Sequence, residues 1–247
     1  MIASDSRRSV GAGLRQMTAI VVKDLKSDSR AKEIAPTMIL FALALVFLFS
    51  FTLPPGAGRA AVPEARAGAI GAREVAGSIL WISLLFAGVI GFGRSASADH
   101  DGSRIEGLVM APVDPAILYA GKTMANLAFL TLLEAALVPI FILLLDVRPG
   151  LLFPEIVAVA MAANIGLAAV GSLFAAASQY ARTRSLMLPL LTFPVVLPLL
   201  LGASRLTSVL LTSGGLGDQT RWLGLLLVYD LIFVTIGAVT FEFVIQE

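Results

Sequence analysis

Six blocks of mostly apolar residues divide this chain, and they limit what it can fold into more than any other feature. They run over residues 35–53, 75–93, 123–145, 152–178, 186–203 and 222–243. A stretch of this length crosses the hydrocarbon core of a bilayer as a helix. Only helices and closed barrels satisfy every backbone polar group in that environment. The sequence therefore predicts an all-α membrane protein with six transmembrane helices.

Composition excludes the other broad classes of protein. Of the 247 residues, 57% are hydrophobic and 14% are charged, against about 45–50% and about 25% in soluble chains. The formal charge is +1 and there is no cysteine. No basic field therefore points to a nucleic-acid partner, and disulfides and thiolate metal sites are excluded. No polar stretch is long enough for a soluble domain, so we expect residues 1–247 to form a single membrane domain.

Lysine and arginine residues set the expected orientation. Twelve of the 18 fall on the side of the predicted membrane that holds both chain ends, and six fall on the other. Because cytoplasmic loops carry the excess of these residues, we expect both termini to be cytoplasmic.

Residues 14–32 precede the first block and follow a different pattern. Leu14, Met17, Val21 and Leu25 recur every three or four residues, and the basic residues lie largely elsewhere around the helix. This pattern predicts an amphipathic helix that lies in the bilayer interface. The alternative is a solvated helix that docks on protein.

The residue types of catalytic centres are sparse in this chain. Gly121-Lys122-Thr123 resembles the end of a P-loop, but Ala116 stands where that loop needs glycine, and the tripeptide opens a membrane span. His100 is the only histidine, which is too few for a histidine-rich metal site. We therefore expect a non-catalytic chain that binds no metal or cofactor itself.

Glu134 is the most costly residue within the six blocks. A carboxylate near the bilayer centre costs several kcal/mol unless it is protonated, paired or facing a cavity. We expect a neutral carboxylic acid that donates a hydrogen bond to a neighbouring helix, with Asn126 and Asn164 as candidate partners. The alternative is that Glu134 serves an ion-coupled carrier or an intramembrane enzyme.

Prolines mark expected hinges. The fifth block contains Pro189, Pro194 and Pro198, and the third contains Pro139. Each proline removes a backbone donor and kinks a helix. The fifth block is therefore expected to be a bent or broken span, as in transport pathways, although proline is also common in membrane helices.

The longest cytoplasmic connection runs over residues 94–118. Apolar residues around Glu106 predict a short amphipathic helix that Pro112 closes, and exposed apolar residues there need a protein partner or the bilayer surface. The alternative is a plain connector. The residues that we expect to bind a partner are Arg94, Asp99, Gly102, Glu106, Gly107, Leu108, Pro112 and Asp114.

The chain resembles the CcmB family of ABC-type permeases, which have six spans and are membrane components of the haem exporter of cytochrome c maturation. The most specific part of the resemblance is the run from Glu106-Gly107-Leu108 to Ala111-Pro112-Val113. Nearly the whole length contributes, including Lys23-Asp24-Leu25, Phe49-Ser50-Phe51, Trp81, Leu85-Phe86-Ala87-Gly88, Tyr119, Gly121-Lys122, Glu134, Pro139 and the prolines of the fifth block.

The resemblance implies an ABC-2-like (type V) permease in the bacterial inner membrane. It also implies several partners: an ATP-hydrolysing subunit docked on the 94–118 loop, a haem-handling membrane subunit, a small single-span subunit and a haem chaperone. The implied function is haem export or delivery, including release of the haem-loaded chaperone, with haem as cargo and ATP bound by the partner. Two alternatives remain: an ABC-2 permease for a lipid, glycan or drug, and an ATPase-independent carrier that uses Glu134.

Overall fold

The computed structural model describes residues 13, 15–26, 34–52, 72–100, 114–145, 153–178, 184–213 and 219–246. The described residues are helical apart from single positions at helix ends. The long helices are α2 (Ile34–Thr52), α3 (Ala72–His100), α5 (Pro115–Leu145), α6 (Phe153–Ala177), α7 (Arg184–Ser213) and α8 (Thr220–Gln246). Residues 15–26 form a further helix, called here the N-terminal helix. The part of the chain that the structure describes is therefore all-α.

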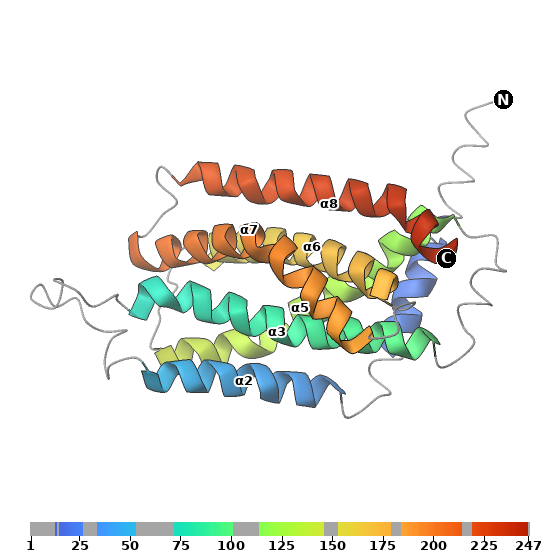
Figure 1. Ribbon diagram of the computed structural model, residues 1–247. Helices are drawn as coiled ribbons and strands as arrows, with labels where there is room; N and C mark the ends of the chain where they lie inside the picture. Colours follow the sequence, from blue (N-terminus) through green and yellow to red (C-terminus); the bar gives the residue numbers. More distant parts are fainter. Residues whose placement is uncertain are drawn as a thin grey trace, which may run out of the picture.

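The long helices form one bundle around α6. Their axes run roughly along a common direction, and the N-terminal helix crosses one end of the bundle (Figure 1). α3 packs most extensively against α7, whereas α6 contacts α3, α5, α7 and α8. α6 therefore packs against four of the other five long helices, and residues on every side of it are buried.

The two ends of the bundle are distinct. At the end that we call basal, the N-terminal helix meets α5 where Ile20 contacts Gly121, and Gly93 of α3 contacts Leu188 of α7. The end of α8 lies there too (Figure 1). At the opposite, distal end, the Oγ atoms of Ser78 and Ser204 are 2.6 Å apart. Neighbours such as α3 and α7 therefore run antiparallel.

Helix length and composition agree with a membrane location. Four helical segments are long and apolar enough to cross a bilayer: Pro115–Leu144, Phe153–Ala177, Leu186–Leu211 and Thr220–Val244. Among the described residues, α2 and α3 carry the shorter apolar stretches Pro36–Phe51 and Gly77–Gly93. The protein is therefore a multi-pass helical membrane protein.

The distribution of polarity supports the same conclusion. Large apolar side chains face outward, such as Leu143, which is 80% exposed, and Leu231, which is 69% exposed. Polar side chains such as Asn164 and Thr192 are fully buried. A soluble monomer rarely exposes so much contiguous apolar surface, whereas a surface in contact with lipid is expected to be apolar and to keep polar groups inside.

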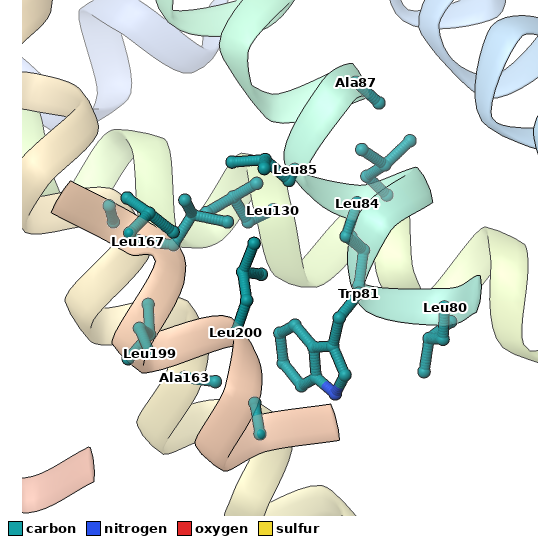
Figure 2. Packing of buried hydrophobic residues seen from close by; sticks show 14 of the residues in the cluster. Leu80, Trp81, Leu84, Leu85, Ala87, Leu130, Ala163, Leu167, Leu199 and Leu200 are labelled. Atoms are coloured by element: carbon teal, nitrogen blue, oxygen red, sulfur yellow. The ribbon is translucent and has the colours of Figure 1, made fainter. Parts of the chain in front are cut away.

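The apolar core lies between α3, α5, α6 and α7. Figure 2 shows Trp81, Leu84 and Leu85 of α3 facing residues of the other three helices, among them Leu130, Leu167 and Leu200. Small residues on α6 allow this close packing, because Phe92 of α3 occupies the space that a Cβ atom at Gly171 would need. Close contact through small residues is what drives helix association in lipid.

The expected connection over 94–118 is helical at both of its described ends. α3 continues through His100, since no proline or glycine interrupts residues 94–100. α5 begins at Pro115, and the Asp114 Oδ1 atom accepts a hydrogen bond of 2.8 Å from the Ala116 amide. An aspartate N-cap followed by proline at the first helical position is a strong start signal. Hydropathy locates the apolar part of a helix and misses these polar ends.

α7 remains a single helix in spite of its prolines. Pro189, Pro194 and Pro198 all lie inside Arg184–Ser213, and Figure 1 shows α7 bending along its length. Of the two forms expected for this block, the structure has the bent one. Pro139 likewise lies inside α5.

Candidate functional site

Glu134 is held inside the bundle by α6. It is 8% exposed, and Asn164 Nδ2 donates a hydrogen bond of 2.6 Å to its Oε2 atom. Of the two amides expected as partners, Asn164 is the one in contact. The direction differs from the expectation, because Glu134 accepts here. A half-turn of the Asn164 amide exchanges donor and acceptor, so the same contact can serve both the carboxylate and the carboxylic acid.

Asn126 has a different partner from the expected one. Its Nδ2 atom donates a hydrogen bond of 2.7 Å to Ser172 Oγ on α6. Asn126 lies two helical turns from Glu134, too far along α5 for their side chains to share one partner. The two amide contacts therefore join α5 to α6 at two depths, which is the interhelical role that polar residues commonly have in membranes.

Tyr119 extends this polar face of α5 towards the basal end. Its hydroxyl lies 3.1 Å from the Ala169 carbonyl oxygen of α6 and 3.3 Å from that of Phe233 in α8. Gly237 leaves the space on α8 that the Tyr119 ring fills. Tyr119, Asn126 and Glu134 thus lie on one face of α5, and together they fix its position against α6 and α8.

A second buried carboxylate, Asp230 on α8, was not predicted from the sequence. Asp230 is 8% exposed, like Glu134. Its Oδ1 atom has no hydrogen-bond partner within the described residues and lies where a Cβ atom at Gly166 would stand. Oδ1 therefore faces a Cα–H group of Gly166, a contact worth far less than an ordinary hydrogen bond.

The two carboxylates lie on opposite sides of α6. Glu134 contacts α6 at Asn164, and Asp230 contacts it at Gly166. Successive residues of an α-helix are about 100° apart around the axis, so positions 164 and 166 point in nearly opposite directions. The middle of the bundle therefore holds two separate acidic positions with α6 between them.

Tyr229, next to Asp230, connects α8 to the proline-rich part of α7. Its hydroxyl donates a hydrogen bond of 3.0 Å to the Val195 carbonyl oxygen, between Pro194 and Pro198. Prolines at these positions leave nearby carbonyl groups of α7 without their helical partners. The Tyr229 contact stabilises α8 against this bent segment.

At the basal end, the N-terminal helix docks on α5. Lys122 Nζ lies 3.2 Å from Asp24 Oδ2, and Lys23 Nζ lies 3.1 Å from Asp24 Oδ1. The N-terminal helix thus contacts protein along Ile20 and Asp24, while Val22 and Lys26 are exposed. Gly121-Lys122-Thr123 lies within α5, where it cannot form the loop that cradles a phosphate.

The residues expected to bind a partner fall into two groups. Gly102, Glu106, Gly107, Leu108 and Pro112 lie outside the described residues. Of the remaining three, Arg94 and Asp99 lie in the last turns of α3, and Asp114 caps α5. Within the described ranges, no group of three or more histidine, cysteine, aspartate or glutamate side chains is placed to hold a metal ion.

Comparison with known protein families identifies a match over nearly the whole chain. A sequence profile of the family described as "CcmB protein" matches residues 15–245. The matched range begins with the N-terminal helix and ends in the last turn of α8. None of the curated proteins compared with the chain matches it.

Proposed function

The chain belongs to the CcmB family, the haem-exporter permease components of cytochrome c maturation, and we propose that it is the six-span membrane subunit on which a separate ATPase subunit acts. The family match over residues 15–245 is the observation that carries this proposal. In the complex, ATP hydrolysis by the partner drives haem export or delivery and the release of the haem-loaded chaperone. This chain supplies the membrane pathway or scaffold and no catalytic group.

The bundle supports an ABC-2-like (type V) arrangement. In addition to the four long apolar segments, α2 and α3 each carry a shorter one, and six spans place both chain ends on one side. The segment 101–113 joins the end of α3 to the beginning of α5, and both of these lie at the basal end. A partner that docks there acts directly on two helices of the core.

We propose that the basal end faces the cytoplasm of a bacterial inner membrane. Single cysteines at Ser103 and Ser185 should be shielded from an impermeant thiol reagent in intact cells, and one at Ala69 should react. The chain has no cysteine of its own, so the background is clean. Reaction at Ser103 together with protection at Ala69 would reverse the orientation.

Coupling is proposed to run through Glu106 and the segment Gly107–Pro112. Glu106→Ala should weaken copurification of the ATPase subunit or uncouple hydrolysis from holo-cytochrome c formation, while the level of this chain in the membrane stays the same. Full association and full cytochrome yield in a Glu106→Arg variant would show that the segment is not the docking site.

The function as a whole is tested by purification from the host and by genetic replacement. The complex should contain an ATPase subunit, a haem-handling membrane subunit and a small single-span subunit. Loss of this chain should abolish holo-cytochrome c, and so should a hydrolysis-deficient ATPase subunit. Transport by the purified chain without any ATPase would instead establish the carrier alternative. If loss of this chain left cytochrome c normal but abolished export of a lipid or glycan, the chain would instead be an ABC-2 permease for that substrate.

A further inference from the structure

The basal end contains a buried ion pair that the proposed function does not use. Asp24 of the N-terminal helix and Lys122 of α5 approach to 3.2 Å, with side chains 7% and 17% exposed. Asp24 also contacts Lys23, whose side chain is 38% exposed. The same carboxylate thus bridges one lysine on its own helix and one on the core of the bundle.

Apolar contacts beside the ion pair also join the two helices. A Cβ atom at Gly121 would lie 3.0–3.3 Å from three atoms of Ile20, and one at Gly13 would lie 3.0 Å from Ile117 Cδ1. Ile20 and Asp24 are one helical turn apart and form the buried face of the N-terminal helix. The helix is therefore seated on the first two turns of α5.

The contact between the N-terminal helix and α5 lies close to the segment on which the ATPase subunit is proposed to act. α5 begins at the Asp114 cap, directly after the segment 101–113 on which the proposed ATPase subunit acts. The same helix carries Tyr119, Asn126 and Glu134 into contact with α6 and α8. A displacement that enters at the beginning of α5 therefore acts on the turns that the N-terminal helix contacts.

We propose that Asp24 is a positioning residue for energy coupling: it holds Lys122 and thereby fixes the basal turns of α5 against the N-terminal helix. This inference rests on the proposed function. An ion pair that is largely buried adds little net stability, because the cost of removing both charges from water offsets their attraction. The pair is therefore better suited to setting the register of two helices than to holding the fold together.

Docking is tested separately from function. In a chain with Ile20→Cys and Gly121→Cys and a protease site inserted between residues 60 and 61, oxidation in membranes should join the two cleaved halves by a disulfide. The positions of Ile20 Cβ and of a Cβ atom at residue 121 are 3.1 Å apart, and a small shift brings them to the separation of about 3.5–4.5 Å that a disulfide needs. Failure to cross-link would overturn the docking and leave the proposed function standing.

The role in coupling is tested in the intact complex with Asp24→Asn, Lys122→Gln and the double variant. Each single change should lower the cross-link and the holo-cytochrome c yield several-fold, with normal membrane level and normal ATPase-subunit copurification. The double variant should give a yield no lower than that of the more damaging single variant, because both changes break the same interaction. Arg15→Gln removes an exposed charge from the same helix and should leave all four readouts unchanged.

Two outcomes would overturn the positioning role. One is a wild-type cytochrome yield in Asp24→Asn, which would make the pair incidental to coupling. The other is a fall in membrane level that matches the fall in yield, which would make it a folding contact. If the wild-type complex copurifies with no ATPase subunit, the proposed function fails first, and the cross-link still reports whether the helix docks.

Discussion

Glu134 and Asp230 have the same burial and opposite surroundings. Both are 8% exposed, and both lie near the middle of the bundle, on either side of α6. Asn164 gives Glu134 a hydrogen-bond partner at 2.6 Å. Asp230 Oδ1 lies against Gly166 and has no hydrogen-bond partner within the described part of the chain. Glu134 is held to α6 by the Asn164 side chain, whereas Asp230 fits against α6 because Gly166 has no side chain.

This difference predicts which partner each acid depends on. The position of Glu134 depends on a polar group that can be removed, so loss of either member leaves a buried polar atom unpaired. The position of Asp230 depends on empty space at Gly166, so it is sensitive to added volume. Substitutions on each side of α6 should therefore act through different physical causes.

The largest effect is expected from Gly166→Ala. A Cβ atom there would collide with Asp230 and lie 2.9 Å from Leu199 Cδ1 and 3.1 Å from Tyr229 Cδ1. Overpacking of this kind costs about 1–3 kcal/mol. We expect a marked loss of thermal stability in detergent and of membrane level, measured by fluorescence-detected gel filtration.

Two further variants show whether the collision is the cause. Gly224→Ala on α8 is the matched control, because nothing lies within 4 Å of a Cβ atom at that position. Adding Asp230→Ala to Gly166→Ala should restore part of the stability, since the carboxylate is then absent and the two effects are not additive. If Gly224→Ala lowered stability as much as Gly166→Ala, the cause would be the changed backbone freedom at a former glycine and not the collision.

Substitutions at Glu134 should have the next largest effect. A comparison of glutamine with leucine at this position separates a packing role from proton coupling. Glu134→Gln keeps the shape and a hydrogen bond to Asn164, so most of the holo-cytochrome c yield should remain. Glu134→Leu leaves the Asn164 amide unpaired, at a cost of about 1–2 kcal/mol. Yields are compared at matched membrane levels. Equal loss in both variants is the signature of proton coupling, because neither side chain can release a proton.

Asp230→Ala should have a smaller effect of opposite sign. It removes a carboxylate oxygen that has no hydrogen-bond partner, so stability should stay the same or rise by up to about 1 kcal/mol. The melting temperatures of Asp230→Ala and Glu134→Ala, measured side by side, should move in different directions. A clear drop in the melting temperature of both variants would mean that both acids stabilise the protein in the same way.

The smallest effect is expected from Asn126→Ala. The contact between Asn126 and Ser172 is a single interhelical hydrogen bond of 2.7 Å, and such bonds average about 0.6 kcal/mol in membrane proteins. The Asn126→Ala variant and the double variant Asn126→Ala with Ser172→Ala should therefore have nearly equal stability. A loss as large as that of Glu134→Leu would give Asn126 a role beyond packing.

Sequence patterns predicted the helices better than their partners. Apolar blocks of sufficient length indicate a bundle. Asp230 lies inside the sixth block as Glu134 lies inside the third, so its residue type and position could have marked it as a second buried acid. The pairing of Glu134 with Asn164, and of Asn126 with Ser172, depends on how α5 and α6 are rotated about their axes. That rotation is set by contacts between residues far apart in the chain. The beginning of α5 could have been read from the Asp114-Pro115 cap.

The polar face of α5 has a consequence for biosynthesis. When α5 leaves the ribosome, Glu134 and Asn126 precede their partners on α6 by 30 and 46 residues. Released alone into lipid, α5 would carry these groups unpaired at a cost that a neighbouring helix removes. Only residues 146–152 separate α5 from α6. The two helices should therefore leave the translocon together as a hairpin.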